Sequence, residues 1–92
     1  MRVPGYALVE LTVDRQAEVL RLAESDRHIA DAERKVTRQQ LRLDRLRADG
    51  HDTKAAEEML RAFEDALKTF REHRHLIVMT IEQIDKGLRD RQ

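Results

Sequence analysis

Asp49-Gly50-His51-Asp52-Thr53 separates two long segments that each have the repeating pattern of an amphipathic helix. Gly50 can adopt a left-handed conformation without the steric penalty of a Cβ atom, so it suits the position just after a helix end. Arg45 and Arg47 favour the negative end of the preceding helix dipole. We therefore predict that the first helix ends near Asp49; if Gly50 closes a Schellman-type cap, His51 should fold back against Leu46.

The second helix should begin directly after this turn. We expect Asp52 or Thr53 to accept hydrogen bonds from the free backbone N–H groups of its first turn. A connection this short places two long helices side by side and antiparallel. The predicted fold is an all-α, coiled-coil-like two-helix hairpin. Its parts are a loose or partly helical arm over 1–11, a first helix over about 12–49, a turn over 50–52 and a second helix over about 53–90.

Both segments carry a heptad pattern, in which seam residues alternate at spacings of three and four. In the first segment the seam is Leu22, Ser25, Ile29, Ala32, Val36, Gln39, Leu43 and Leu46. In the second it is Ala56, Leu60, Phe63, Leu67, Phe70, Arg74, Ile77, Ile81, Ile84 and Leu88. Two such seams predict one shared apolar interface.

The register of this interface follows from pairing residues outward from the turn, which puts Leu43 near Leu60. The same register was not built from charges, yet it predicts two ion pairs on one flank: Arg47 with Glu57, and Glu33 with Arg71.

Two polar residues interrupt the seams. We expect Arg74 to form a structural ion pair with Glu33 or Asp26. Gln39 falls opposite Phe63 and is interpreted as a residue that fixes register or dimer geometry at some cost in stability.

Composition limits the possible functions. The 92 residues are 39% charged and only 3% aromatic, which is typical of long exposed helices. The net charge is zero, and no cysteine is present for disulfide or thiolate chemistry. No secretory signal or membrane-spanning segment is recognised, so the expected location is the cytoplasm. No nucleophile with a base, phosphate loop or paired carboxylates is found, so we expect neither an enzyme nor a cofactor site.

A hairpin of this size shares only one seam, which is marginal against the conformational entropy of ordering its residues. The second helix shows another row beside its seam, made mostly of small residues that permit close helix packing. Residues 76–81 are also apolar nearly all round, as expected for a segment buried on more than one side. We therefore predict a homodimeric four-helix bundle that packs through Ala55, Met59, Ala62, Ala66, Thr69, His73, Leu76 and Thr80.

Two other functions stay open. His28 and His73 flank the seam on the same side and could face each other in a metal or pH-responsive site, although two histidines are too few for a structural metal. A basic run on the first helix could bind nucleic acid by charge alone: Arg34, Lys35, Arg38, Arg42, Arg45 and Arg47. Against it, we expect carboxylates at matching height on the second helix to offset the run: Glu57, Glu58, Glu64 and Asp65.

Several short segments together resemble a group of short, uncharacterised bacterial proteins built as helical hairpins. The resembling segments are Asp26-Arg27-His28-Ile29-Ala30, Glu33-Arg34, Ala48-Asp49-Gly50-His51-Asp52-Thr53, Leu60 with Phe63, and His73-Arg74. The resemblance implies a cytosolic bacterial protein of unknown role and transfers no catalytic, metal or cofactor residue. The leading functional hypothesis is a non-enzymatic structural or protein-interaction module.

Overall fold

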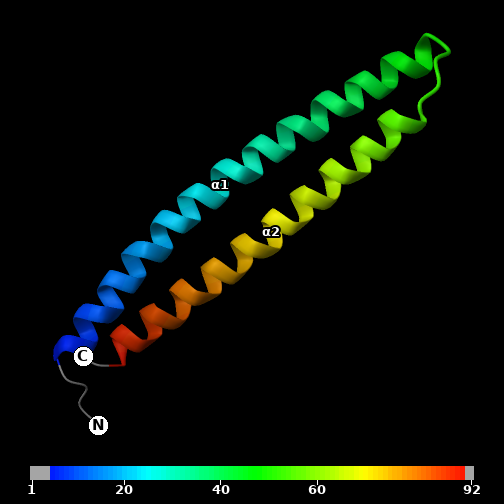
Figure 1. The fold of residues 1–92 in the computed structure, drawn as a ribbon. Helices are drawn as coiled ribbons and strands as arrows, with labels where there is room; N and C mark the ends of the chain where they lie inside the picture. Colours follow the sequence, from blue (N-terminus) through cyan, green and yellow to red (C-terminus); the bar gives the residue numbers. More distant parts are fainter. Residues whose placement is uncertain (1–4, 91–92) are drawn as a thin grey trace. The chain divides into compact units, whose positions relative to one another are not determined.

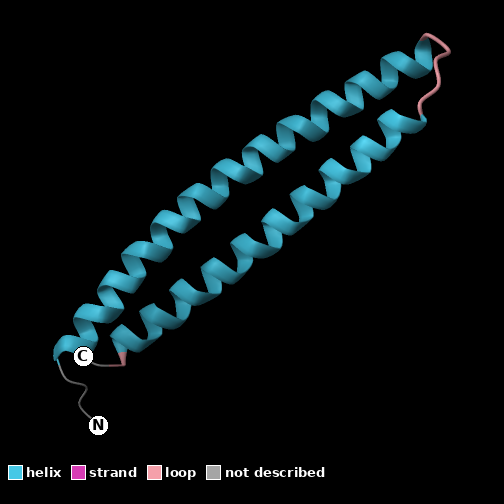
Figure 2. Ribbon diagram, viewed as in Figure 1, coloured by secondary structure: helices cyan, strands magenta, loops and turns pink. Residues whose placement is uncertain are grey.

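The computed structural model describes residues 5–90, with the side chains of residues 6–8 left out. It contains two helices, α1 over Gly5–Ala48 and α2 over Lys54–Arg89, and no strand in the described part (Figures 1 and 2). The two helices contact each other along their seams, so the chain is an all-α helical hairpin. The fold class predicted from the turn and the heptads is confirmed.

The start of α1 differs from the prediction. The helix begins at Gly5 instead of near Thr12, so the expected arm is helical wherever it is described, and residues 1–4 lie outside the described part. The physical reason is tertiary contact with the end of α2. Leu11 lies beside Gly87, where an added Cβ would be 3.8 Å from the Leu11 Cδ1 atom, and Arg15 bonds to Asp85. These contacts support helix formation in a segment whose sequence pattern is ambiguous.

The C-terminal cap of α1 has the predicted Schellman geometry. Gly50 has a φ of 72°, in the left-handed region. The His51 N–H donates to the Leu46 carbonyl at 2.9 Å, and the Gly50 N–H donates to the Arg47 carbonyl at 3.1 Å. The last carbonyls of α1 are therefore satisfied by the turn itself, and the chain reverses direction there.

The start of α2 is capped by the residues expected for that role. The Asp52 carboxylate accepts a hydrogen bond from the Lys54 N–H at 3.1 Å, and the Glu57 N–H donates to the Thr53 carbonyl at 2.8 Å. The connection between the helices spans 49–53, one residue longer at each end than the predicted turn.

The chain divides into two compact units. One unit is Arg27–Glu72, which contains the turn; the other combines Met1–Asp26 with His73–Gln92. We call them the turn unit and the terminal unit. In each unit a segment of α1 lies alongside a segment of α2 (Figure 1).

The core of the turn unit is the predicted seam. Leu43 is only 2% exposed and packs with Ala56 and Leu60, while Val36 and Leu46 cover this cluster. Ala32, Gln39 and Leu67 are also buried. The pairing of Leu43 with Leu60 confirms the register derived from the turn.

One flank of the turn unit carries the two predicted ion pairs. Arg47 and Glu57 are 3.1 Å apart, and Arg71 and Glu33 are 3.8 Å apart. All four side chains are well exposed, so each pair contributes at most about 1 kcal/mol to stability. Their main effect is to favour this register over others.

The terminal unit buries Ile77, Ile81 and Ser25 in its seam. Arg74 pairs with Asp26 at 2.7 Å, which selects one of the two partners expected for it. A second ion pair, not anticipated from the sequence, joins Arg15 to Asp85 at 2.6 Å. Both pairs join an arginine of one helix to an aspartate of the other.

The residues described include no helix with enough length and apolar character to cross a lipid bilayer.

Candidate functional site: a groove on the turn unit

The second flank of the turn unit, opposite the one that carries the ion pairs, is open. There α2 presents the part of the predicted small-residue row that belongs to this unit, which we call the α2 row: Ala55, Met59, Ala62, Ala66 and Thr69. All of its members are exposed, and Met59 is 48% exposed. The remaining predicted row residues belong to the terminal unit and are exposed as well: His73, Leu76 and Thr80. The row is therefore accessible in the single chain.

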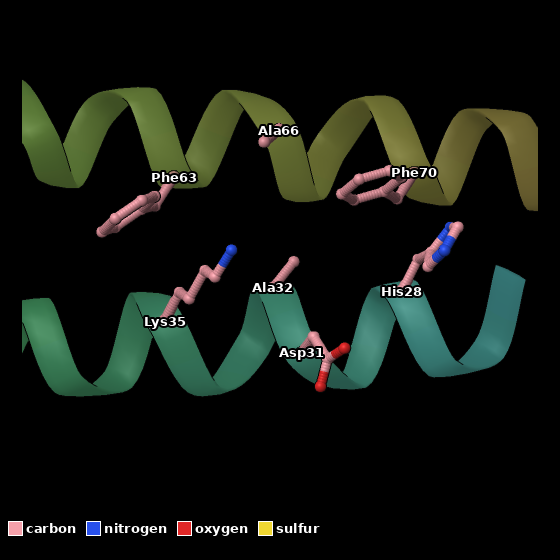
Figure 3. A pocket seen from close by; sticks show the side chains of 7 residues that line it. All are labelled: His28, Asp31, Ala32, Lys35, Phe63, Ala66 and Phe70. Carbon is pink, nitrogen blue, oxygen red and sulfur yellow. The ribbon is translucent and has the colours of Figure 1, made fainter.

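A hollow of about 330 Å³ lies beside the middle of the α2 row. From α2 it is lined by Phe63, Ala66 and Phe70, whose two rings are partly exposed because Ala66 between them is small (Figure 3). From α1, Lys35 extends toward α2 across the hollow, between the two rings. His28, Asp31 and Ala32 complete its α1 side, so the hollow combines an apolar floor with an α1 edge that carries both a cation and a carboxylate.

A second hollow of about 280 Å³ lies nearer the turn. Its apolar lining comes from Ala55, Ala56 and Met59 of α2 and from Leu46 of α1. Its polar lining comes from Gln39, Arg42 and Asp52. We call the two hollows together the groove, because both lie along the α2 row.

The α1 edge of the groove is basic. Four of its cations pair with no carboxylate among the residues described, and we call them the basic wall: Lys35, Arg38, Arg42 and Arg45. Elsewhere on the basic run, Arg34 pairs with Asp31 on its own helix and Arg47 with Glu57. The basic wall is therefore a source of positive charge that the rest of the turn unit leaves available.

The expected neutralisation of this run by α2 was wrong except at Glu57. Glu58, Glu64 and Asp65 form no ion pair within the described part of the chain. The reason is geometric, since Glu58 and Asp65 fall on the face of α2 that points away from α1, beyond the α2 row. We call Glu58, Asp65 and Glu72, which share this face at heptad spacing, the acidic row.

The predicted histidine pair is not supported as a metal site. His28 packs its ring against Phe70, with ring centroids 5.4 Å apart and an angle of 46° between the planes. His73 belongs to the terminal unit, so neither unit by itself contains both histidines. Among the residues described, no group of three or more histidine, aspartate or glutamate side chains is placed to hold a metal ion.

The terminal unit also exposes apolar side chains. Leu76 is 60% and Met79 is 42% exposed, within the segment whose sequence is apolar nearly all round. On α1 of the same unit, Val9, Val13 and Leu20 are exposed on its outer surface. This α1 patch was not recognised from the sequence, although spacings of four and seven residues were a usable signal for one face.

Comparisons with protein-family models, with curated proteins and with solved structures find no match. The resemblance to bacterial hairpin proteins stays a prediction.

Proposed function

We propose that this protein is a non-enzymatic interaction module that forms a homodimer through the groove and the α2 row. The observation that carries the proposal is the exposed α2 row beside two apolar hollows on an otherwise charged surface. Small side chains let a second helix approach closely, and the partly exposed rings of Phe63 and Phe70 would lose the rest of their water contact beneath it. A cytoplasmic setting, expected from the sequence, is part of the same proposal.

The limited core of the turn unit supports this proposal. Its buried side chains form a single line between two helices, and two of its larger seam residues, Phe63 and Phe70, remain partly exposed. Small domains with one narrow core commonly gain the missing apolar burial by oligomerisation. A second hairpin over the groove would supply a second interface of the four-helix-bundle type.

The test is solution mass by light scattering over a concentration series. We expect about twice the 10.8 kDa of the chain at high concentration, with loss of helix on dilution. The variant Ala66→Lys should shift the protein toward the monomer, because it places a long charged side chain on the floor of the groove.

The control is Ala23→Lys, which introduces the same side chain at an exposed mid-helix position of α1 away from the groove. It should leave the mass and its concentration dependence unchanged. A fully helical 10.8 kDa monomer at every concentration, or equal effects of the two variants, would contradict the homodimer.

Nucleic-acid binding is a second candidate, favoured by the four unpaired cations of the basic wall. Binding by charge alone weakens steeply with added salt, because each neutralised phosphate releases counterions. Reversing the charge at Arg38, Arg42 and Arg45 should then abolish retention of a labelled oligonucleotide. Failure of the unchanged protein to bind the oligonucleotide at low salt would remove this candidate.

A further inference from the structure

The groove and its two charged borders limit how two copies can pack. On α1 the apolar floor is bordered by the basic wall, and on α2 the α2 row is bordered on its far side by the acidic row. Both borders carry charges that find no partner within the described residues. A second copy brings the same two borders, so it can satisfy both if basic wall meets acidic row.

The positions of these charges along the helix axes follow from contacts within the turn unit. The Arg47–Glu57 and Glu33–Arg71 pairs set which residues of α1 and α2 lie at the same level. Stepping along the helices from these pairs puts Arg45 near the level of Glu58 and Arg38 near the level of Asp65. The seven-residue spacing from Arg38 to Arg45 equals that from Glu58 to Asp65, so both pairs can form together.

Two hairpins that share a groove interface under twofold symmetry have two simple arrangements. If the axis runs across the helices, the turns point in opposite directions and each α1 lies on the other α1, with basic wall against basic wall. If the axis runs along the helices, both turns lie at the same end and each α1 lies on the other copy's α2. Only the second arrangement joins opposite charges.

We propose that the dimer has its two turns at the same end, with Arg38 facing the partner's Asp65 and Arg45 facing the partner's Glu58. This arrangement makes every neighbouring helix pair antiparallel, as in up-down-up-down bundles. The inference rests on the proposed homodimer. It adds the relative orientation of the two copies and the ion pairs that select this orientation. Twofold symmetry repeats the two ion pairs on both sides of the dimer.

The charge complementarity between the basic wall of one copy and the acidic row of the other ends one heptad further from the turn. There the α1 residue is Asp31, which would lie near the partner's Glu72, another carboxylate. Asp31 is paired with Arg34 on its own helix, and this cation compensates the charge at that level. The proposal therefore assigns the orientation to the Arg38 and Arg45 pairs alone.

The first test is neutralisation of the wall with the double variant Arg38→Gln and Arg45→Gln. Losing four exposed ion pairs per dimer should raise the dimer dissociation constant roughly tenfold at low salt, with a smaller effect at high salt. The matched control is Arg61→Gln with Lys68→Gln, two exposed cations of α2 that face away from the groove. An unchanged or lower dissociation constant for the Arg38/Arg45 variant would overturn the proposed orientation, because facing basic walls bind more tightly once neutralised.

The second test measures a distance between the two copies directly. The chain has no cysteine, so Arg27→Cys, at an exposed α1 position of the turn unit far from the turn, gives one spin-label site per copy. Turns at the same end should give a distance between labels below about 35 Å, since helices in a bundle are spaced by about 10 Å. Turns at opposite ends would separate the labels by roughly 45 Å along the helix axes alone, because Arg27 lies about 15 residues beyond the middle of the α2 row. A monomer would refute the proposed function, whereas a dimer with the longer distance between labels would refute only its orientation.

Discussion

The side-chain amide of Gln39 donates a hydrogen bond to the backbone carbonyl of Ala56 at 3.0 Å. Gln39 is only 6% exposed, and Ala56 lies in the first turn of α2, so the bond joins the C-terminal part of α1 to the start of α2 inside the seam. A buried amide can be tolerated there because its donor is satisfied. This contact refines the predicted register role of Gln39, which the heptad pattern places opposite Phe63.

We expect Gln39→Ala to lower the free energy of unfolding by roughly 1–3 kcal/mol, since it removes a buried hydrogen bond and most of a packed side chain. The control is Gln40→Ala, which removes an exposed amide bonded to Asp44 on the same helix. That change should cost only a few tenths of a kcal/mol. Urea unfolding at a fixed chain concentration measures both, and equal losses would show that the Gln39 bond contributes nothing specific.

Gly50→Ala tests the cap of α1. No atom lies within 4 Å of a Cβ built on Gly50, so the only penalty is the left-handed backbone at a φ of 72°. We expect a loss of about 1 kcal/mol in unfolding free energy. Gly5→Ala is the matched control, because its Cβ also meets no atom within 4 Å and its φ is not positive. A harmless Gly50→Ala substitution would mean that the turn has another conformation in solution.

Much of this fold could be predicted because local chemistry and periodicity agree. Gly50 between two heptad segments admits few structures other than a hairpin, and the turn then fixes the register that brings Arg47 to Glu57. Each seam residue named from the sequence is buried or partly buried in the structure. Local signals of this kind are strong because the heptad repeat continues over many turns.

The groove and the start of α1 were harder to predict. Whether Lys35, Arg38 and Arg42 are paired depends on side-chain directions around the helix, which net charge and residue height do not reveal. The helix before Thr12 depends on contacts with the end of α2, among them Arg15 with Asp85. Both features depend on tertiary contacts between the helices. Local sequence patterns do not contain this information.

Ser25 is buried in the seam of the terminal unit, and its hydroxyl finds no hydrogen-bond partner among the residues that the structure describes. An unsatisfied buried hydroxyl costs about 1–3 kcal/mol, so we expect Ser25→Ala to raise the free energy of unfolding. Alanine also favours helix, and Thr37→Ala, at an exposed helical position, measures that separate contribution. Thermal or urea unfolding should show a larger gain for Ser25→Ala. A gain no larger than that of Thr37→Ala would indicate that water satisfies the hydroxyl in solution.

Acid should weaken the ion pair that joins Arg15 to Asp85. The hydrogen bond donated by Arg15 is the main reason why the pKa of the Asp85 carboxyl lies below its ordinary value of 3.8, and the positive charges of Arg15 and Arg89 add to this effect. A carboxyl whose pKa is lower in the folded state stabilises the fold above its unfolded pKa, and that contribution is lost as pH falls through the folded pKa. At neutral pH, Asp85→Asn should therefore be less stable than the unchanged protein. The gap should close as pH falls below about 4.

The matched control for this prediction is Asp14→Asn, an exposed aspartate of the same unit that forms no ion pair with any residue described. Unfolding should be followed by circular dichroism from pH 7 to pH 2 at one chain concentration and constant ionic strength. The stability difference caused by Asp85→Asn should shrink with acid, whereas Asp14→Asn should behave like the unchanged protein throughout. A difference at Asp85 that does not shrink at all between pH 7 and pH 2 would mean that the aspartate acts through packing, because protonation of the carboxylate would then have no effect on stability.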